Sequence, residues 1–212
     1  MRTTFLLASL LAAAPFAASA ASADQLSYNY IEGGYARVDI DDSFLGDPKG
    51  DGGYLRGSFS LGPQVNVFAS YGSVSKGQRL DATTRLDADL KRGEIGVGYH
   101  MNMSERVDFL AEIAYQRLEL DLALSVQGNP SQNANLSEDA KGGRVGVGVR
   151  GKPSARTEAW LKASYLDGGD FVGDFAGNLG GQINFTPTWG LVGEVEIIED
   201  FTTYQVGIRA SF

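Results

Sequence analysis

The chain has 212 residues, a formal net charge of −8 at pH 7 and no cysteine. This length suits one domain or at most two small ones. The acidic balance argues against nucleic-acid binding, which needs basic patches, and the absence of cysteine excludes disulfides as the source of stability. Glycine is abundant, with 28 residues against 6 prolines, which fits pleated strands joined by turns better than a disordered chain.

The first residues have the layout of a secretory signal peptide. Arg2 is followed by the apolar run FLLASLLAAAPFA and then by two sets of small residues, which end at Ala20 and Ala23. This is the pattern of a leader that is cleaved on export, and the apolar run is too short to cross a bilayer as a helix. We therefore expect cleavage after one of these two alanines, which divides the chain into a signal peptide, 1–23, and a mature domain, 24–212.

The mature chain repeats a two-residue alternation of apolar and polar side chains. The alternation recurs in ten stretches separated by turn residues, and helical periodicity is hard to find anywhere. The strands predicted in this way are 26–38, 54–62, 65–73, 91–101, 107–117, 143–151, 157–165, 175–185, 189–198 and 202–212.

The connections between these strands alternate in length. The short links are 62–64, 102–106, 153–155 and 186–188, and they alternate with long links at 39–53, 74–90, 123–142 and 166–174. The last connection, around 199–201, is the exception, because it is a tight hairpin where a long link is expected. This asymmetry is typical of outer-membrane barrels, whose short turns face the periplasm and whose long loops face outside. The sequence predicts an all-β, transmembrane, antiparallel up-and-down β-barrel of ten strands. Eight strands are the alternative, if 26–38 or 175–185 fails to pair.

Alternation also fits a soluble barrel or sandwich with one solvated face, but the aromatic residues favour the membrane. They fall near the strand ends, where outward rings would meet the lipid headgroups. We assign an outer girdle of Tyr35, Tyr71, Tyr115, Tyr165 and Tyr204, and a periplasmic girdle of Tyr99, Phe109, Phe185, Trp189 and Phe212. The expected location is the outer membrane of a Gram-negative bacterium, in contact with the lipid bilayer and lipopolysaccharide.

The opposite strand faces carry ionised side chains of both signs. A barrel of ten strands is narrow enough for side chains to fill most of the bore, and unpaired charges there would be costly. We therefore expect a lumen network of Arg56, Arg92, Glu94, Asp108, Glu112, Arg144, Arg150, Glu158, Lys162, Glu194, Glu196 and Arg209. Glu32 is left out, because the strand phase near Tyr30 is ambiguous. The network has two interpretations, a salt-bridged core that holds the barrel rigid and a gate in a pore.

Turn geometry predicts two pairs in this network at the periplasmic mouth. A turn centred on Ser154 places Arg150 directly across from Glu158, and one centred on Ser104 places His100 across from Asp108.

Enzymatic chemistry finds little support in the sequence. An outer-membrane hydrolase needs a histidine with an acidic or serine partner at the outer rim, and the single histidine, His100, ends a strand that runs toward the periplasm. Without cysteine or a second histidine there is no transition-metal site. The acidic first loop, 39–52, could hold calcium but lacks EF-hand spacing, and we interpret it as a flexible surface loop. We predict no catalytic residue, no cofactor and no metal.

The chain ends on the alternating stretch TTYQVGIRASF. Its residues Gln205, Gly207, Ala210 and Phe212 match the polar-x-Gly-x-x-apolar-x-aromatic signal that the bacterial barrel-assembly machinery recognises. That machinery is therefore the partner expected during insertion.

The stretches LSYNYIEGGYARVD, FTPTWGLVGEVE and VGIRASF resemble the small outer-membrane proteins of xanthomonads first named activators of XA-mediated immunity. The resemblance implies an exported barrel that is shed in outer-membrane vesicles and linked to biofilm formation, and it carries no catalytic residues.

The expected function is a non-enzymatic surface or envelope protein that binds or adheres through its extracellular loops. A narrow porin-like diffusion channel is the alternative, and an outer-leaflet enzyme is a third hypothesis. No extracellular ligand can be identified from the sequence.

Overall fold

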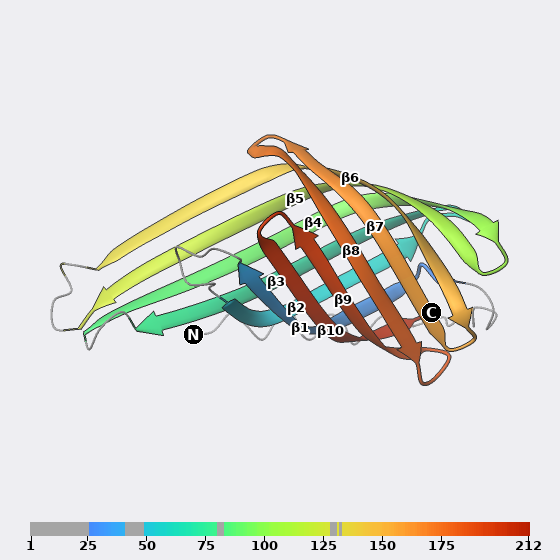
Figure 1. Cartoon of the computed structure of the whole chain (residues 1–212), viewed down its shortest axis with the longest axis horizontal. Coiled ribbons are helices and arrows are strands. Elements are labelled where there is room, and N and C mark those ends of the chain that lie inside the picture. The colour runs from blue at the N-terminus through green and yellow to red at the C-terminus, as the bar shows by residue number, and fades with distance from the viewer. Residues whose placement is uncertain (1–25, 41–48, 80–82, 128–130, 132) are drawn as a thin grey trace.

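The computed structural model describes residues 26–40, 49–79, 83–127, 131 and 133–212, which form one closed sheet of ten antiparallel strands (Figure 1). The strands are β1 (Tyr30–Ile40), β2 (Lys49–Ser60), β3 (Val65–Arg79), β4 (Thr84–Ser104), β5 (Val107–Val126), β6 (Ala134–Ser154), β7 (Thr157–Gly168), β8 (Phe171–Asn184), β9 (Trp189–Ile198) and β10 (Phe201–Ser211). The expected signal peptide lies outside the described residues. No helix in the described part of the chain is long and apolar enough to cross a membrane.

The barrel closes through β1, which pairs with β10 on one edge and with β2 on the other. Tyr35 lies opposite Val206 of β10 and Gly53 of β2. In the same way β8 pairs with both β7 and β9. The prediction of ten strands is confirmed. The eight-stranded alternative is wrong, because both segments that it would omit are paired along two edges.

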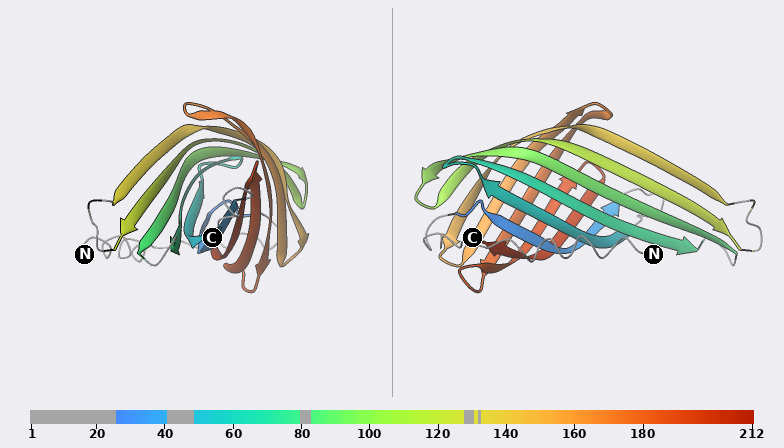
Figure 2. Two further views of the ribbon diagram at one scale, coloured as in Figure 1. Left: turned by 60° about the vertical axis from the view of Figure 1, so that its left-hand side comes forward. Right: turned by 180° about the vertical axis from the view of Figure 1, so that it is seen from behind.

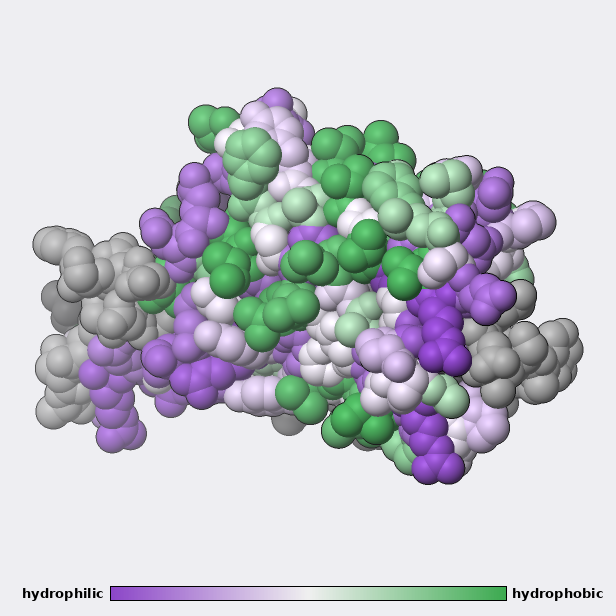
Figure 3. All heavy atoms as spheres, turned by 45° about the vertical axis from the view of Figure 1, so that its right-hand side comes forward, coloured by the Kyte–Doolittle hydropathy of each residue, from purple (hydrophilic) through white to green (hydrophobic). Residues whose placement is uncertain are grey.

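Apolar side chains point away from the barrel and polar ones point into it. Ile113 of β5 is 61% exposed, whereas Gln116 three residues later is 1% exposed. A soluble barrel packs its apolar face inward, so this arrangement requires an apolar solvent around the sheet. Figure 3 shows the result on one face of the molecule: apolar side chains gather over its middle and hydrophilic ones gather toward its two ends.

Four strands are much longer than predicted. Most of the expected loops 74–90 and 123–142 are strand, and hydrogen-bonded pairing of β4 with β5 continues to Thr84 opposite Val126. Figure 2 shows the ends of β3 to β6 projecting beyond the other strands as a curved sheet. We call this sheet the outer wall; it comprises 74–79, 84–91, 117–126 and 134–142.

The prediction failed there for a physical reason. It took apolar residues to mark the outward face, but in β4 and β5 of the outer wall the apolar side chains lie on the inward face and the charged ones on the outward face. The two-residue alternation is therefore present, but its apolar and charged residues have exchanged faces, and the prediction interpreted it as polar loop.

Smaller differences concern the ends of other elements. The expected loop 166–174 is a tight turn, because Gly168 pairs with Phe171 and the glycines at 168 and 169 have φ values of 81° and 66°, which only glycine adopts at little cost. β1 begins at Tyr30, so residues 26–29 precede the sheet. The first outer connection shortens to 41–48, which lies outside the described residues.

The most buried ion pair lies at the seam between β1 and β10. Glu32 and Arg209 face each other in register, are 1% and 3% exposed, and are joined by a hydrogen bond of 2.6 Å from Nε to Oε2. The Tyr54 hydroxyl donates to the other carboxylate oxygen at 2.7 Å. Leaving Glu32 out of the lumen set was wrong, because its side chain points inward.

Replacing one member of this pair should destabilise the barrel strongly. We expect Arg209→Leu to lower the free energy of unfolding by about 3–5 kcal/mol, because it leaves the Glu32 carboxylate buried without its cation. Arg85→Leu breaks an exposed pair with Asp87 and should cost below about 1 kcal/mol. Urea unfolding in lipid vesicles, followed by the gel mobility of unboiled samples, measures both. Equal midpoints would show that the buried pair contributes nothing.

A second prediction concerns the space beside Trp160. A Cβ on Gly180, its cross-strand neighbour in β8, would collide with the indole ring, whereas a Cβ on Gly177 would meet no atom within 4 Å. Gly180→Val should therefore destabilise the protein by about 1–3 kcal/mol through overpacking. Gly177→Val, on the outward face of the same strand, is the matched control and should leave the same unfolding midpoint unchanged.

Candidate functional site: the bore and its two mouths

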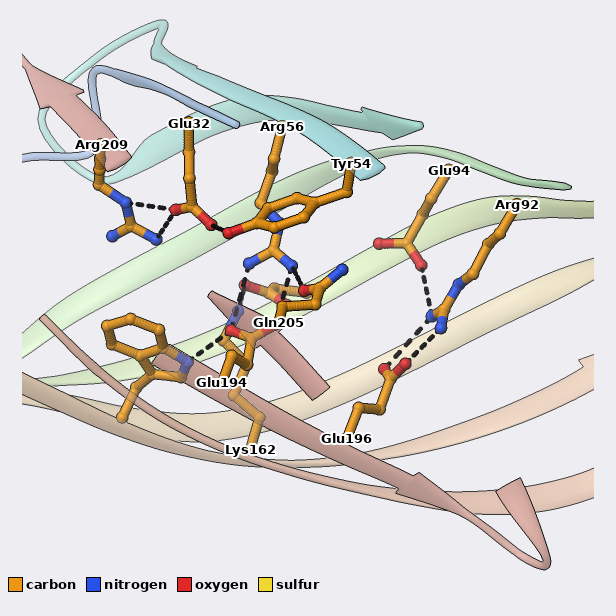
Figure 4. Close-up of polar contacts among 12 residues, drawn as sticks. Glu32, Tyr54, Arg56, Arg92, Glu94, Lys162, Glu194, Glu196, Gln205 and Arg209 are labelled. Carbon is orange, nitrogen blue, oxygen red and sulfur yellow. Dashed lines mark hydrogen bonds and ion pairs between the residues drawn. The ribbon is translucent and has the colours of Figure 1, made fainter. Parts of the chain in front are cut away.

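Side chains cross the bore from wall to wall. Arg92 of β4 and Glu196 of β9 form an ion pair through both guanidinium nitrogens. Five steps around the ring of ten strands separate β4 from β9, so this pair joins opposite sides of the barrel (Figure 4). Arg144 of β6 reaches the same carboxylate at 2.9 Å.

These three residues and Glu94 form a closed set that we call the arginine layer. Glu94 lies 3.2 Å from Arg144 and 3.5 Å from Arg92, so two guanidinium groups and two carboxylates alternate around the bore. Each charge has partners of opposite sign, which offsets the cost of removing it from bulk water. The layer carries no net charge that would favour a particular ion.

A second set of contacts lies deeper in the bore. Glu194 accepts hydrogen bonds from Arg56 at 2.8 Å and from the Trp160 indole at 2.8 Å, and Arg56 also donates to Gln205 at 2.6 Å (Figure 4). Lys162 pairs with Glu112 at 2.6 Å. With the Glu32–Arg209 pair, these contacts come from strands all around the barrel and tie them together through its interior.

The segment before β1 fills the periplasmic mouth. Tyr28 is buried, stacks on His100 with ring centroids 3.7 Å apart, and donates a hydrogen bond to Asp108 at 2.8 Å. The Arg150 guanidinium lies 5.0 Å from the centroid of the Tyr28 ring and donates a hydrogen bond to the Ser27 carbonyl oxygen at 2.9 Å. Tyr28 therefore acts as a plug, which the sequence did not indicate because the residue was assigned to a strand.

The two predicted registers at this mouth are wrong. Bulges near the turns shift the pairing, so Arg150 lies opposite Trp160 and His100 opposite Leu110. Arg150 still reaches Glu158 along the bore and forms an ion pair with it. Asp108, instead of pairing with the histidine, accepts its hydrogen bonds from Tyr28 and Asn102.

At the outer mouth the inward face changes from charged to apolar. In β5 the inward residues are Glu112, Ala114 and Gln116 within the membrane part, and then come Leu118, Leu120 and Leu122. The same change occurs in β4, where Glu94 and Arg92 are followed by Leu90, Ala88 and Leu86. A concave apolar surface results, which we call the outer bowl and which is formed by Val38, Ile40, Val74, Leu86, Ala88, Leu90, Leu118, Leu120, Leu122, Leu166, Phe171 and Ile198.

The outer bowl opens into the bore as one cavity of about 930 Å³. Val38 and Val74 belong to a packed cluster with Tyr54, and Ile40 and Leu90 lie against it. Sequence reasoning missed this surface, but its signal was present: LDADL (86–90) and LELDLAL (118–124) alternate with leucine on one face and acid on the other.

The outward face of the outer wall is covered with charge pairs. Lys91 lies 2.7 Å from Asp121, and Lys141 lies 2.8 Å from Asp139. The hydrogen bonds from these lysines lower the pKa of each aspartate. These groups are accessible to water, so this part of the sheet lies beyond the hydrocarbon region, where such charges would be costly.

The predicted girdle residues lie on the outward face of the strands. Tyr35, Tyr71, Tyr115 and Tyr204 are exposed at the level where the outer wall begins, while Tyr165 is partly covered by its contact with Phe175. At the other end Tyr99, Phe185 and Trp189 are exposed, Phe109 is half-buried, and Phe212 is partly covered.

The terminal residues contribute to the closed sheet itself. Gln205 points inward to Arg56, and Gly207 approaches Gly33 and Tyr54 so closely that a Cβ would collide with both. Ala210 pairs with Ile31. The Phe212 amide donates a hydrogen bond to Asn29 at 3.0 Å.

The acidic first loop lies mainly outside the described residues. Of its aspartates that are described, Asp39 pairs with Arg37 and Lys49, and Asp51 accepts a hydrogen bond from Tyr35. Within the described ranges no group of three or more histidine, cysteine or acidic residues is placed to hold a metal ion.

Solved outer-membrane proteins resemble this chain in fold. Ail of Yersinia pestis, solved with the heparin analogue sucrose octasulfate, is 14% identical, and the match covers 89% of this chain and 100% of Ail with a TM-score of 0.45. OprG of Pseudomonas aeruginosa is 12% identical over 91% of this chain and 99% of its own, with a TM-score of 0.48. The outer membrane protease OmpT of Escherichia coli is 9% identical over 90% and 100%, with a TM-score of 0.52.

No curated protein matches the chain. The family model described as outer membrane protein beta-barrel domain, however, matches residues 4–171, which is more than half of the sequence. With the closed sheet, the outward apolar belt and the polar bore, this match shows that the chain belongs to the outer membrane protein beta-barrel domain family and lies in the bacterial outer membrane.

Proposed function

We propose that this protein is a closed barrel of the bacterial envelope that binds or adheres outside the cell and conducts no solute. The observation that carries the proposal is the Arg92–Glu196 pair, which spans the bore between opposite walls. The pair and its neighbours in the arginine layer narrow the bore. A solute that pushed them aside would separate each charge from its partner in a confined, poorly solvated space.

The periplasmic plug is a second obstacle, independent of the first. Tyr28 is held by three contacts, with Asp108, His100 and Arg150, and all three must break before its ring can move aside. The porin-like alternative would require both obstacles to be displaced. Channels that conduct keep a hydrated path along their lining, and here the polar groups of the lining bond to one another across the bore.

The outer wall supports a role outside the cell. A strand needs about 9–11 residues to cross a bilayer, whereas β4, β5 and β6 have 21, 20 and 21. The additional residues contribute nothing to membrane spanning, and they form an ordered sheet with charges of both signs on its outward face. Adhesion of the biofilm type would therefore act through this wall rather than through flexible loops. We also propose that the protein belongs to the xanthomonad group and is released in outer-membrane vesicles.

The proposal includes no enzymatic activity. A hydrolase that uses a histidine base at the cell surface needs it near the outer rim, and the single histidine of the chain, His100, lies at the opposite end of the barrel, stacked on Tyr28.

Two partners of the envelope complete the proposal. The outer tyrosine girdle would contact lipopolysaccharide at the headgroup level, and the terminal residues Gln205, Gly207, Ala210 and Phe212 would be recognised by the barrel-assembly machinery during insertion.

Conductance measurements in planar bilayers test the closed bore. We expect no stepwise current from the wild-type protein, and steady current from the triple variant Tyr28→Ala, Arg92→Ala, Glu196→Ala, because it lacks both obstacles. The double variant Arg85→Ala, Asp87→Ala removes a charge pair from the outward face of the wall and should stay closed.

Wild-type current as large as that of the triple variant would contradict the closed bore and favour the diffusion channel. Gel mobility of unboiled samples shows whether each variant is folded before it is recorded.

The adhesive role can be tested by shortening the outer wall. Residues 76–88 and 122–136 can each be replaced by Asn-Gly, because Ser75 lies opposite Asp89 and Asp121 opposite Ser137, and this dipeptide closes two-residue hairpins. Cells that carry the shortened barrel should attach to a surface less than cells with the full chain, at equal amounts of protein in the outer membrane. Equal attachment would remove the wall from the proposal.

A further inference from the structure

We infer that the outer bowl binds a single-chain amphiphile from the water outside the cell, with the apolar chain enclosed by the leucines and the polar group at the mouth. The inference deepens the proposed function, since it names a ligand class for the extracellular side. It begins from the reversal of hydropathy between the two parts of the same strands.

The reversal gives the outer wall an apolar inner face that membrane spanning does not require. In β4 the outward residues Arg85, Asp87 and Asp89 alternate with the inward Leu86, Ala88 and Leu90, and β5 repeats this pattern with its leucines. A wall surrounded by water could be polar on both faces. Instead Leu120 remains 38% exposed to the cavity, and Leu86 and Leu122 are only partly covered, so a large apolar surface faces the space inside.

The shape of this space suits a chain rather than a flat surface. The bowl is lined by the projecting sheet of β3 to β6 and, nearer the membrane, by the outer ends of β1, β7, β8 and β9, and it leads to the arginine layer. The bowl is the outer part of a cavity that includes the bore. The whole cavity measures about 930 Å³, within the range of small-molecule sites, about 300–1,000 Å³. Val74 and Leu90 line one side, and Leu118, Leu166 and Ile198 line others.

The charges decide the orientation of the ligand. At the floor Arg92 and Arg144 are neutralised by Glu94 and Glu196, so the floor offers no net charge to a headgroup. The rim of the cavity is polar, with Lys49, Lys76, Gln78 and Glu138. A ligand that enters with its chain first keeps its polar group among these side chains and in contact with water.

The ligand must come from outside rather than from the acyl chains of the bilayer. Tyr71 and Tyr115 mark the level of the headgroups, and the bowl residues of β3 and β5 follow them toward the outer end of each strand. The outward face between bilayer and bowl carries Lys91 and Asp121, which separates the hydrocarbon region from the leucines.

Thiol protection provides a direct test, because the chain has no cysteine. The Ala88→Cys variant places one thiol in the bowl, and Asp89→Cys places one on the outward face of the same strand, one residue away. Both are reconstituted in lipid nanodiscs and reacted with a charged methanethiosulfonate reagent. The probes are dodecanoate, below its micelle concentration, and butanoate, which has the same headgroup without the chain.

Saturating dodecanoate should slow the reaction of the Ala88→Cys thiol by at least about tenfold, the factor that corresponds to about 1.4 kcal/mol. Butanoate should have no effect there, and neither probe should affect Asp89→Cys. Equal slowing at both thiols, or no slowing at either, would overturn the inference.

A second variant links protection to the leucines. Adding Leu120→Asn to Ala88→Cys should raise the dodecanoate concentration for half-protection about tenfold, whereas Glu119→Gln, on the outward face next to it, should leave it unchanged. If dodecanoate protects the thiol at the same concentration with and without Leu120→Asn, the bowl is not the site. Conductance tests the bore separately from thiol protection. If dodecanoate gave no protection and the barrel carried no current, this inference would be rejected while the closed-barrel proposal would stand.

Discussion

The structure depends on one constraint: within the hydrocarbon region every backbone N–H and C=O must bond inside the protein. A sheet meets this constraint only when it has no edge, and β1 supplies the closure by pairing with β10 as well as β2. Closure then fixes which face meets lipid and which faces the bore. The buried Glu32–Arg209 pair lies at this seam, so the last pairing to be made in chain order is also joined through side chains.

The same strands serve two solvents, and the boundary lies at the outer tyrosines. Below it the outward residues, such as Ile113, must be apolar because they meet acyl chains. Above it the outward residues, such as Asp121, meet water, and the apolar residues turn inward as they would in a soluble protein. Backbone geometry does not change at the boundary, since β4 and β5 remain paired from Ser104 to Thr84. Only the identity of the side chains reports where the bilayer ends.

This boundary explains how much the sequence could predict. The strand number, the antiparallel order and the outward rings follow from alternation and from rings such as Tyr35, because one rule relates apolar character to direction throughout the membrane part. The rule reverses in the outer wall, so Leu118, Leu120 and Leu122 were left outside the predicted strand 107–117 although their period of two is regular. A local pattern gives the period but not which solvent surrounds it.

Other differences arise from the turns and from the segment before the sheet. Bulges near Ser104 and Ser154 move partners by two positions, which placed Arg150 opposite Trp160 instead of Glu158. The ion pair forms nevertheless, because a long guanidinium side chain reaches a diagonal neighbour. The plug could not have been predicted from alternation, since Tyr28 belongs to no strand and its position depends on His100, Asp108 and Arg150, which come from β4, β5 and β6.

The narrowness of a ten-stranded ring links these features to function. Side chains from opposite walls meet in such a bore, and once they pair, as Arg92 and Glu196 do, each carboxylate or guanidinium that is satisfied removes a group that could have solvated a passing ion. Stability of the interior and conduction through it therefore compete for the same polar atoms. The polar side chains of the interior bond to one another, and the apolar outward belt contacts lipid. The surfaces left for recognition are therefore the outward face of the wall and the outer bowl.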